Sequence, residues 1–143
     1  MDDEAVLLDA TRSGVAVITL NRPDVHNAFN AEIVERLSDM FEELRGADGV
    51  RAVLLEATGK NFSAGADLKW MQAAADYTYN DNLEDARNLG IMMHRLHTLP
   101  KPTIALVQGA ARGGGCGLVA ACDMAVAVRG ATFAFTETRL GLI

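Results

Sequence analysis

The residues best suited to chemistry begin with a run of small side chains, Ser63-Ala64-Gly65-Ala66-Asp67. Small side chains let a ligand approach the backbone closely. The run leads into a segment predicted to be helical, and the first N–H groups of a helix are unpaired and lie at the positive end of its dipole. Such N–H groups suit a developing oxyanion. The alternative, a tight turn with Asp67 capping the helix, stays open from these residues alone.

A second run of small residues, Gln108–Gly115, also leads from an apolar strand into a predicted helix. Its outline resembles a phosphate-binding turn. The spacing is not that of a dinucleotide fingerprint, and no Gly-Lys-Ser/Thr ends the run, so a nucleotide P-loop is excluded. Close packing of the strand on the helix explains the glycines equally well. Two such turns with converging N–H groups would form an oxyanion hole, which a thioester carbonyl needs when it becomes an enolate.

Glu137 is the candidate acid–base group. It follows Phe133 and Phe135 and is expected to end a short apolar strand. Apolar walls disfavour the charged form of a carboxylate, which tunes it for proton transfer. The alternative is an exposed glutamate that is paired with Arg139 or unpaired.

Other polar residues give weaker signals. Ser63 lacks the Gly-x-Ser-x-Gly context of a nucleophile elbow. His94 and His97 lack a metalloprotease pattern, so we expect them at the surface or at a helix boundary. Trp70 and Met71 fit an acyl pocket or core packing equally well.

The composition is that of a soluble globular protein, with 50% apolar and 22% charged residues among 143. The net charge of −6 argues against nucleic acid as a partner, and a polyphosphate ligand would need a local basic patch. Cys116 and Cys122 have no partners at metal-ligand spacing, so we expect buried thiols, no disulfide and no metal. The start, Met1–Glu4, lacks a signal-peptide pattern and no apolar run spans a membrane, so we expect a cytoplasmic protein.

Alternating strands and helices predict an α/β fold in one domain. Asn30 is expected to cap a helix that ends before Gly46 and Gly49. Its buried face is predicted to comprise Ile33, Leu37, Met40, Phe41 and Leu44. Strands are predicted at 15–20, 52–57, 103–107, 124–128 and 132–135; further helices at 68–75, 83–99 and about 114–122; and a polar connector at 77–82. The apolar ending Gly141-Leu142-Ile143 leads us to expect a truncated protein.

Five motifs in order resemble the crotonase superfamily, the enoyl-CoA hydratase/isomerase group. They are Leu20–Pro23 with Asn27–Phe29, Phe62–Leu68, Gln108–Gly115, Cys122–Ala125, and Phe133 with Glu137 before Leu140-Gly141. The resemblance covers about Val15 to Ile143. It implies a crotonase-type spiral of ββα units, with residues 1–143 as the N-terminal part of a single domain truncated before the C-terminal helices. It also implies a homotrimer or hexamer when full length.

The resemblance implies site residues as well. Ala66 and Gly114 would donate the two oxyanion-hole N–H groups, and Glu137 would handle water and proton. The CoA groove would be lined by Val25, His26, Ala28, Ala64, Gly65, Ala66, Asp67 and Leu68. The implied partner is an acyl-CoA thioester substrate, with no separate cofactor, because coenzyme A is part of that substrate.

Two departures bear on the activity. Two-glutamate hydratases carry a Glu directly after Gly-Gly-Gly-Cys, where this sequence has Gly117. Crotonase domains are also considerably longer, so we expect the chain alone to be poorly active or inactive. The stretches Arg22–Asn30, Trp70–Gln72 and Asn82–Arg87 are most similar to bacterial methylglutaconyl-CoA hydratase-like members of leucine or acyclic terpene breakdown.

Three functions remain open from the sequence. The first is hydration of an α,β-unsaturated acyl-CoA. The second is Δ3-Δ2-enoyl-CoA isomerisation, which needs one base and no water. The third is non-catalytic binding of acyl-CoA.

Overall fold

A mixed five-stranded sheet forms the centre of the protein, whose computed structural model describes residues 4–12 and 14–141. The first two strands are antiparallel, and the remaining neighbours are parallel. In spatial order the strands are β1 (Val6–Arg12), β2 (Val15–Leu20), β3 (Ala52–Ala57), β4 (Thr103–Val107) and β6 (Met124–Ala127). A small second sheet pairs β5 (Ala110–Arg112) with β7 (Thr132–Ala134) in parallel.

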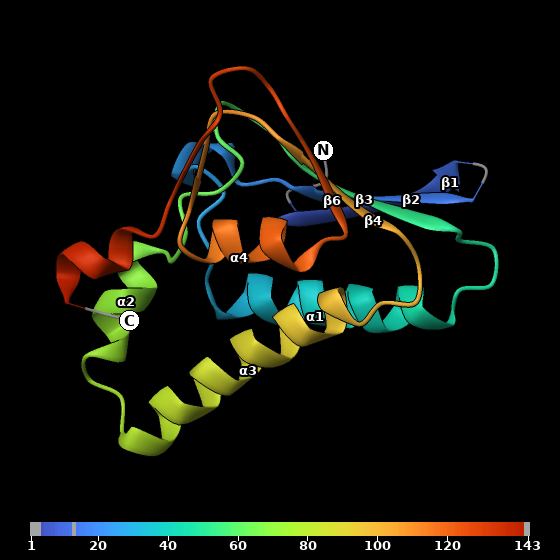
Figure 1. Cartoon of the computed structure of the whole chain (residues 1–143). Coiled ribbons are helices and arrows are strands. Elements are labelled where there is room, and N and C mark those ends of the chain that lie inside the picture. Colours follow the sequence, from blue (N-terminus) through green and yellow to red (C-terminus); the bar gives the residue numbers. More distant parts are fainter. Residues whose placement is uncertain (1–3, 13, 142–143) are drawn as a thin grey trace.

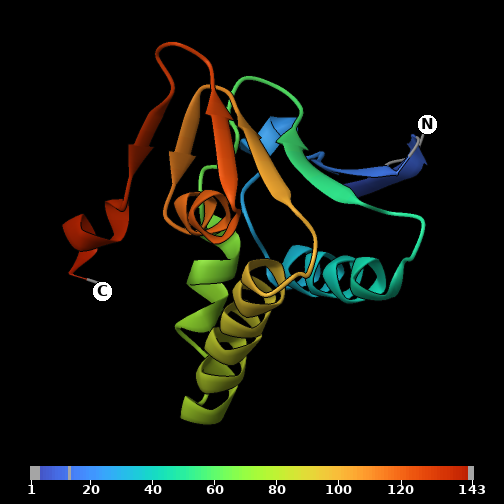
Figure 2. The same cartoon turned by 45° about the vertical axis from the view of Figure 1, so that its right-hand side comes forward.

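Helices pack below the main sheet in the view of Figure 1, where α1 and α4 lie next to the strands and α3 lies beyond them. The α-helices are α1 (Ala31–Gly46), α2 (Leu68–Ala74), α3 (Tyr79–His97) and α4 (Gly114–Ala121). The chain also forms two 3-10 helices, η1 (Pro23–Val25) and η2 (Thr136–Leu140). Figure 2 shows β7 and η2 leading away from the main sheet toward the C-terminus. The predicted α/β class is confirmed.

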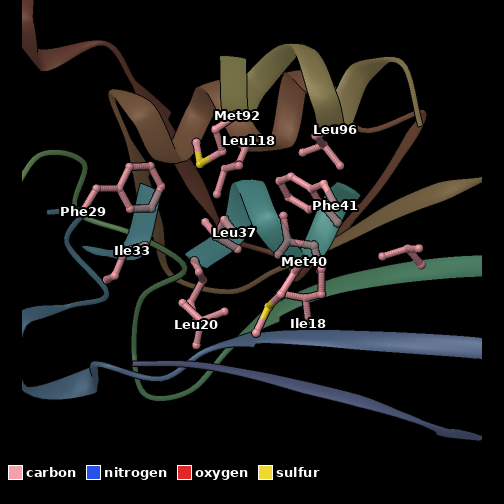
Figure 3. Close-up of a cluster of buried hydrophobic side chains, with 14 of the residues drawn as sticks. Ile18, Leu20, Phe29, Ile33, Leu37, Met40, Phe41, Met92, Leu96 and Leu118 are labelled. Carbon is pink, nitrogen blue, oxygen red and sulfur yellow. The ribbon is translucent and has the colours of Figure 1, made fainter. Parts of the chain in front are cut away.

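The core lies between the sheet, α1, α3 and α4 (Figure 3). Helix α1 begins as expected, because the Asn30 side chain accepts a hydrogen bond from the backbone N–H of Ile33 at 3.0 Å. All five residues predicted for its buried face are at most 2% exposed. The strands and helices that flank residues 63–67 and 108–115 are therefore anchored in one apolar cluster.

Two local predictions were wrong, and strands β1 and β5 were not predicted. Helix α3 starts at Tyr79, inside the expected connector, because Thr78 and Asp81 form a capping box. Strand β1 was not expected; it forms because β2 offers it an antiparallel partner. Glu137 lies in η2 and does not end a strand.

The sheet edge at β6 is unlike the rest of the sheet, because all four residues of this strand are exposed. Met124 and Val126 retain 51% and 62% of their accessible surface. Of the two thiols, Cys116 is buried as predicted and Cys122 is only partly buried; both are free. Within residues 4–12 and 14–141, no helix combines the length and apolar character required to cross a membrane.

Candidate active site

The candidate site lies where three neighbouring parallel strands, β2, β3 and β4, reach their carboxyl ends. Asn27, after β2, donates hydrogen bonds from Nδ2 to the carbonyl oxygens of Thr58 at 2.8 Å and Asn61 at 2.9 Å, both after β3. Gln108, after β4, donates from Nε2 to the carbonyl oxygen of Ala57 at 2.8 Å. The segments after these strands are therefore tied together at the edge of the sheet where α/β proteins commonly bind ligands.

Ala66 lies in an extended segment that pairs with Phe29. The N–H of Phe29 donates to the carbonyl oxygen of Gly65 at 2.7 Å, and the N–H of Asp67 donates to that of Phe29 at 2.7 Å. Ala66 lies between the acceptor Gly65 and the donor Asp67. In a parallel bridge of this form, the residue in that position points its own N–H away from the partner segment. Ala66 is exposed, and its N–H has no acceptor among the described residues. This N–H is available to a ligand.

Gly114 is the first residue of α4, so its N–H has no partner within the helix. The preceding Gly113 has φ 47° and ψ −116°, a conformation that favours glycine, and its N–H donates to the carbonyl oxygen of Ala134 at 3.0 Å. In the described part of the chain the N–H of Gly114 has no acceptor either. The structure thus supplies a second available donor where the sequence predicted one.

The two turns are in direct contact. Ser63 and Ala111 form a parallel backbone bridge, which sets the turns side by side. A Cβ atom added to Gly65 would lie 3.0 Å from the carbonyl oxygen of Arg112, and one added to Gly115 would lie 2.9 Å from the Cβ of Ser63. Side chains at these glycines would push the turns apart, so the small residues allow the close approach.

Glu137 places its carboxylate against the glycine turn. A Cβ atom at Gly113 would overlap Oε1 of Glu137, so the carboxylate occupies the space beside that glycine. Pairing of β7 with β5 brings it there, because the register aligns Ala134 with Arg112. Oε2 is buried and has no hydrogen-bond partner, and no ion pair joins Glu137 to Arg139 in the described residues. The predicted acid–base candidate and the Gly114 turn therefore lie together.

The position of the second glutamate expected in two-glutamate hydratases is Gly117, which packs against Met93. Gly117 lies one helical turn after Gly113, and a Cβ atom there would lie 2.9 Å from Cε of Met93 in α3. The thioether of Met93 therefore occupies the space into which such a side chain would first extend. Glu137 is the carboxylate at this turn.

The residues predicted for the CoA groove form two stretches that meet. The N–H of Ala64 donates to the carbonyl oxygen of His26 at 2.9 Å. Val25 is 41% exposed and Leu68 is 74% exposed, whereas Ala28 is only 7% exposed. The exposed stretch runs through Val25, His26, Ala64, Ala66 and Leu68, with Asp67 partly buried and Gly65 buried. Ala28 contributes packing and not open surface.

The weaker candidates lie at the surface or pack against the core. His94 and His97 are exposed, as predicted. Trp70 is partly buried against the core, and its Nε1 donates to Oδ2 of Asp85 at 3.0 Å, which ties α2 to α3. Across the residues that the structure describes, no three metal-binding side chains gather. Asn27 was missed as a functional candidate; its left-handed φ of 54° and full burial mark it only in the folded chain.

The fold and these turns define a crotonase-type α/β protein. A solved structure of an enoyl-CoA hydratase from Shewanella pealeana matches with a TM-score of 0.94 and 42% identity, covering 98% of this chain and 52% of that chain. The chain belongs to the enoyl-CoA hydratase/isomerase family, whose model matches residues 10–143.

Relatives in this family carry out more than one reaction. A short-chain-enoyl-CoA hydratase of Clostridium acetobutylicum is 37% identical over 133 residues, which cover 90% of this chain and 48% of the relative. A 1,2-epoxyphenylacetyl-CoA isomerase of Escherichia coli is 34% identical over 138 residues, covering 96% and 53%. The chain spans about half the length of the curated relatives that it matches.

Proposed function

We propose that this chain carries the catalytic turns for adding water to the double bond of an α,β-unsaturated acyl-CoA thioester. The observation that supports this most directly is the carboxylate of Glu137 beside Gly113, with its buried Oε2 unpartnered. The next residue, Gly114, offers a backbone N–H, and the contacting turn offers that of Ala66. An acid–base group and two oxyanion donors are the groups that this reaction requires.

In the proposed reaction the thioester oxygen accepts hydrogen bonds from Ala66 and Gly114. Glu137 removes a proton from water as the water oxygen forms a bond to the β-carbon. The electrons of the double bond move toward the carbonyl, and the resulting enolate oxygen is stabilised by the two N–H groups. Protonated Glu137 then returns the proton to the α-carbon, which regenerates the carboxylate and completes the addition of water.

Coenzyme A is proposed to lie along the exposed stretch from Val25 and His26 to Leu68, as part of the substrate and not as a separate cofactor. Lys60 and Lys69 are exposed and lie directly before and after residues 61–68. Their ammonium groups would offset the charge of the CoA phosphates in a chain whose net charge is −6. A branched acyl group such as 3-methylglutaconyl, a cytoplasmic location and a trimer or hexamer of the longer protein complete the proposal.

The test is turnover of trans-2-enoyl-CoA and 3-methylglutaconyl-CoA, followed by loss of the enoyl-thioester absorbance at high protein concentration. Glu137→Gln should lower the rate by roughly 10²- to 10⁴-fold, the usual contribution of general acid–base catalysis. Glu43→Gln is the matched control, because Glu43 is an exposed glutamate on α1. Equal rates for wild type and Glu137→Gln would refute the role of Glu137. Binding of acyl-CoA without turnover by the wild-type chain would support the non-catalytic alternative.

Isomerisation of a Δ3-enoyl-CoA to the Δ2 form is the second candidate. The observation that favours it is the glycine at position 117 packed against Met93, which leaves Glu137 as the carboxylate at the turn. One base suffices for this reaction, since Glu137 would take the proton from the α-carbon and return it to the γ-carbon. Appearance of the conjugated thioester from a Δ3 substrate, without hydrated product, would select this function.

A further inference from the structure

Arg22 contacts both chain segments that hold the Ala66 turn. Its Nη1 donates a hydrogen bond to the carbonyl oxygen of Ala28 at 2.9 Å, and its Nη2 lies 3.3 Å from Oδ2 of Asp67. Ala28 immediately precedes Phe29, and Asp67 immediately follows Ala66. One guanidinium therefore spans the backbone bridge that turns the N–H of Ala66 outward.

The two contacts of Arg22 are partly buried, and their directions are fixed by the planar guanidinium. The side chains of Arg22 and Asp67 are 25% and 12% exposed. Oδ1 of Asp67 accepts the N–H of Lys69 at 2.9 Å, so the same carboxylate also caps α2. The backbone N–H of Arg22 donates to Oδ1 of Asn27 at 2.7 Å, which anchors the arginine itself. A planar guanidinium fixes two acceptors in set directions, which an ammonium group does not.

We propose that Arg22 is a positioning residue for the oxyanion hole: by joining Ala28 to Asp67, it holds the N–H of Ala66 toward the thioester oxygen. The inference rests on the proposed function, because it takes that oxygen as the acceptor. Displacement of about 1 Å from a productive geometry can cost about a hundredfold in rate. A side chain that does not touch the substrate is thereby expected to control how well the enolate is stabilised.

The first test is hydrogen exchange in Arg22→Met, which keeps most of the side-chain stem and loses both contacts. The N–H of Asp67 bonds to Phe29 across the bridge, so its exchange should become at least about tenfold faster. Arg36→Met is the matched control, because Arg36 pairs with Glu4 at 3.7 Å and is far more exposed. Unchanged exchange at Asp67 in Arg22→Met would overturn the proposal.

The second test uses acetoacetyl-CoA, whose bound enolate absorbs in the near ultraviolet and forms when the α-carbon loses a proton. Loss of a whole oxyanion donor costs about 10²- to 10³-fold, so a misplaced donor should lower the enolate-to-keto ratio about tenfold in Arg22→Met. The ratio is read on the bound ligand at saturating acetoacetyl-CoA, and Arg22→Lys should fall between Arg22→Met and the wild type.

Each outcome separates this proposal from the one on which it rests. Faster exchange at Asp67 with an unchanged enolate ratio would make Arg22 merely structural and overturn the positioning role. If the wild-type chain itself binds no enolate, the proposed function fails, and the oxyanion role of Arg22 fails with it. If only the role of Arg22 is wrong, the wild-type chain still shows the enolate absorbance, and the proposed function stands.

Discussion

Gly113→Ala should disturb the candidate site and the stability of the fold together. At φ 47° and ψ −116°, an alanine would occupy a backbone region that is costly for residues with a side chain, by about 1–3 kcal/mol. Its Cβ would also overlap Oε1 of Glu137, so the carboxylate must rotate away from the turn. Rotation of a flexible side chain costs less than moving backbone, so we expect the free energy of unfolding to fall by about 2 kcal/mol.

Urea unfolding followed by the fluorescence of Trp70 measures this change, because Trp70 is the single tryptophan and its hydrogen bond to Asp85 joins α2 to α3. Gly46→Ala is the matched control: it lies at the end of α1, its φ is not positive, and an added Cβ would meet nothing within 4 Å. Its unfolding free energy should be unchanged or rise by up to about 1 kcal/mol. If Gly113→Ala unfolds at the same urea concentration as the wild type, the strain and overlap assigned to Gly113 are wrong.

Two further changes follow from buried groups. Asn27→Ala removes three hydrogen bonds in a fully buried place, so unfolding should become easier by about 3 kcal/mol at roughly 1 kcal/mol per bond; a loss below about 1 kcal/mol in urea melts would contradict this. Burial raises the pKa of the Cys122 thiol to about 11, against the opposing hydrogen bond of Thr103, so alkylation of the native chain should keep accelerating up to about pH 11. The stability that this thiol contributes is present below its unfolded pKa and is lost as pH rises toward 11, and a labelling rate that levels off near pH 9 would argue against the shift.

Local pattern was enough to predict much of the fold. The 3–4 spacing from Ile33 to Leu44 and the cap at Asn30 describe α1 correctly, because amphipathic periodicity and capping act within a few residues. The apolar strands 15–20 and 52–57 were predicted with the bounds that the structure has. Strand β1 could not be predicted from its own residues, because their polar and apolar pattern is mixed. It forms a strand through antiparallel pairing with β2.

The candidate site was predicted only as a set of residue types. The glycine runs pointed to two turns, yet their contact depends on the Ser63–Ala111 bridge between segments far apart in the chain. The overlap of Gly113 with Glu137 and the double contact of Arg22 are likewise tertiary. No spacing in the sequence encodes these distances. The start of α3 is different: Thr78 and Asp81 stand three apart, and that signal was present but overlooked.

Neighbouring parallel strands cannot be joined by a tight hairpin, and here β3 and β4 are separated by both α2 and α3. Closing such long connections costs entropy before any pairing is gained, so these strands are expected to pair late and together during folding. Ser63 and Ala111 follow those two strands, so the two turns that they join are expected to form only when the strands pair. A ligand of the turns would recognise only the native state, and its binding should shift the unfolding midpoint of the whole chain.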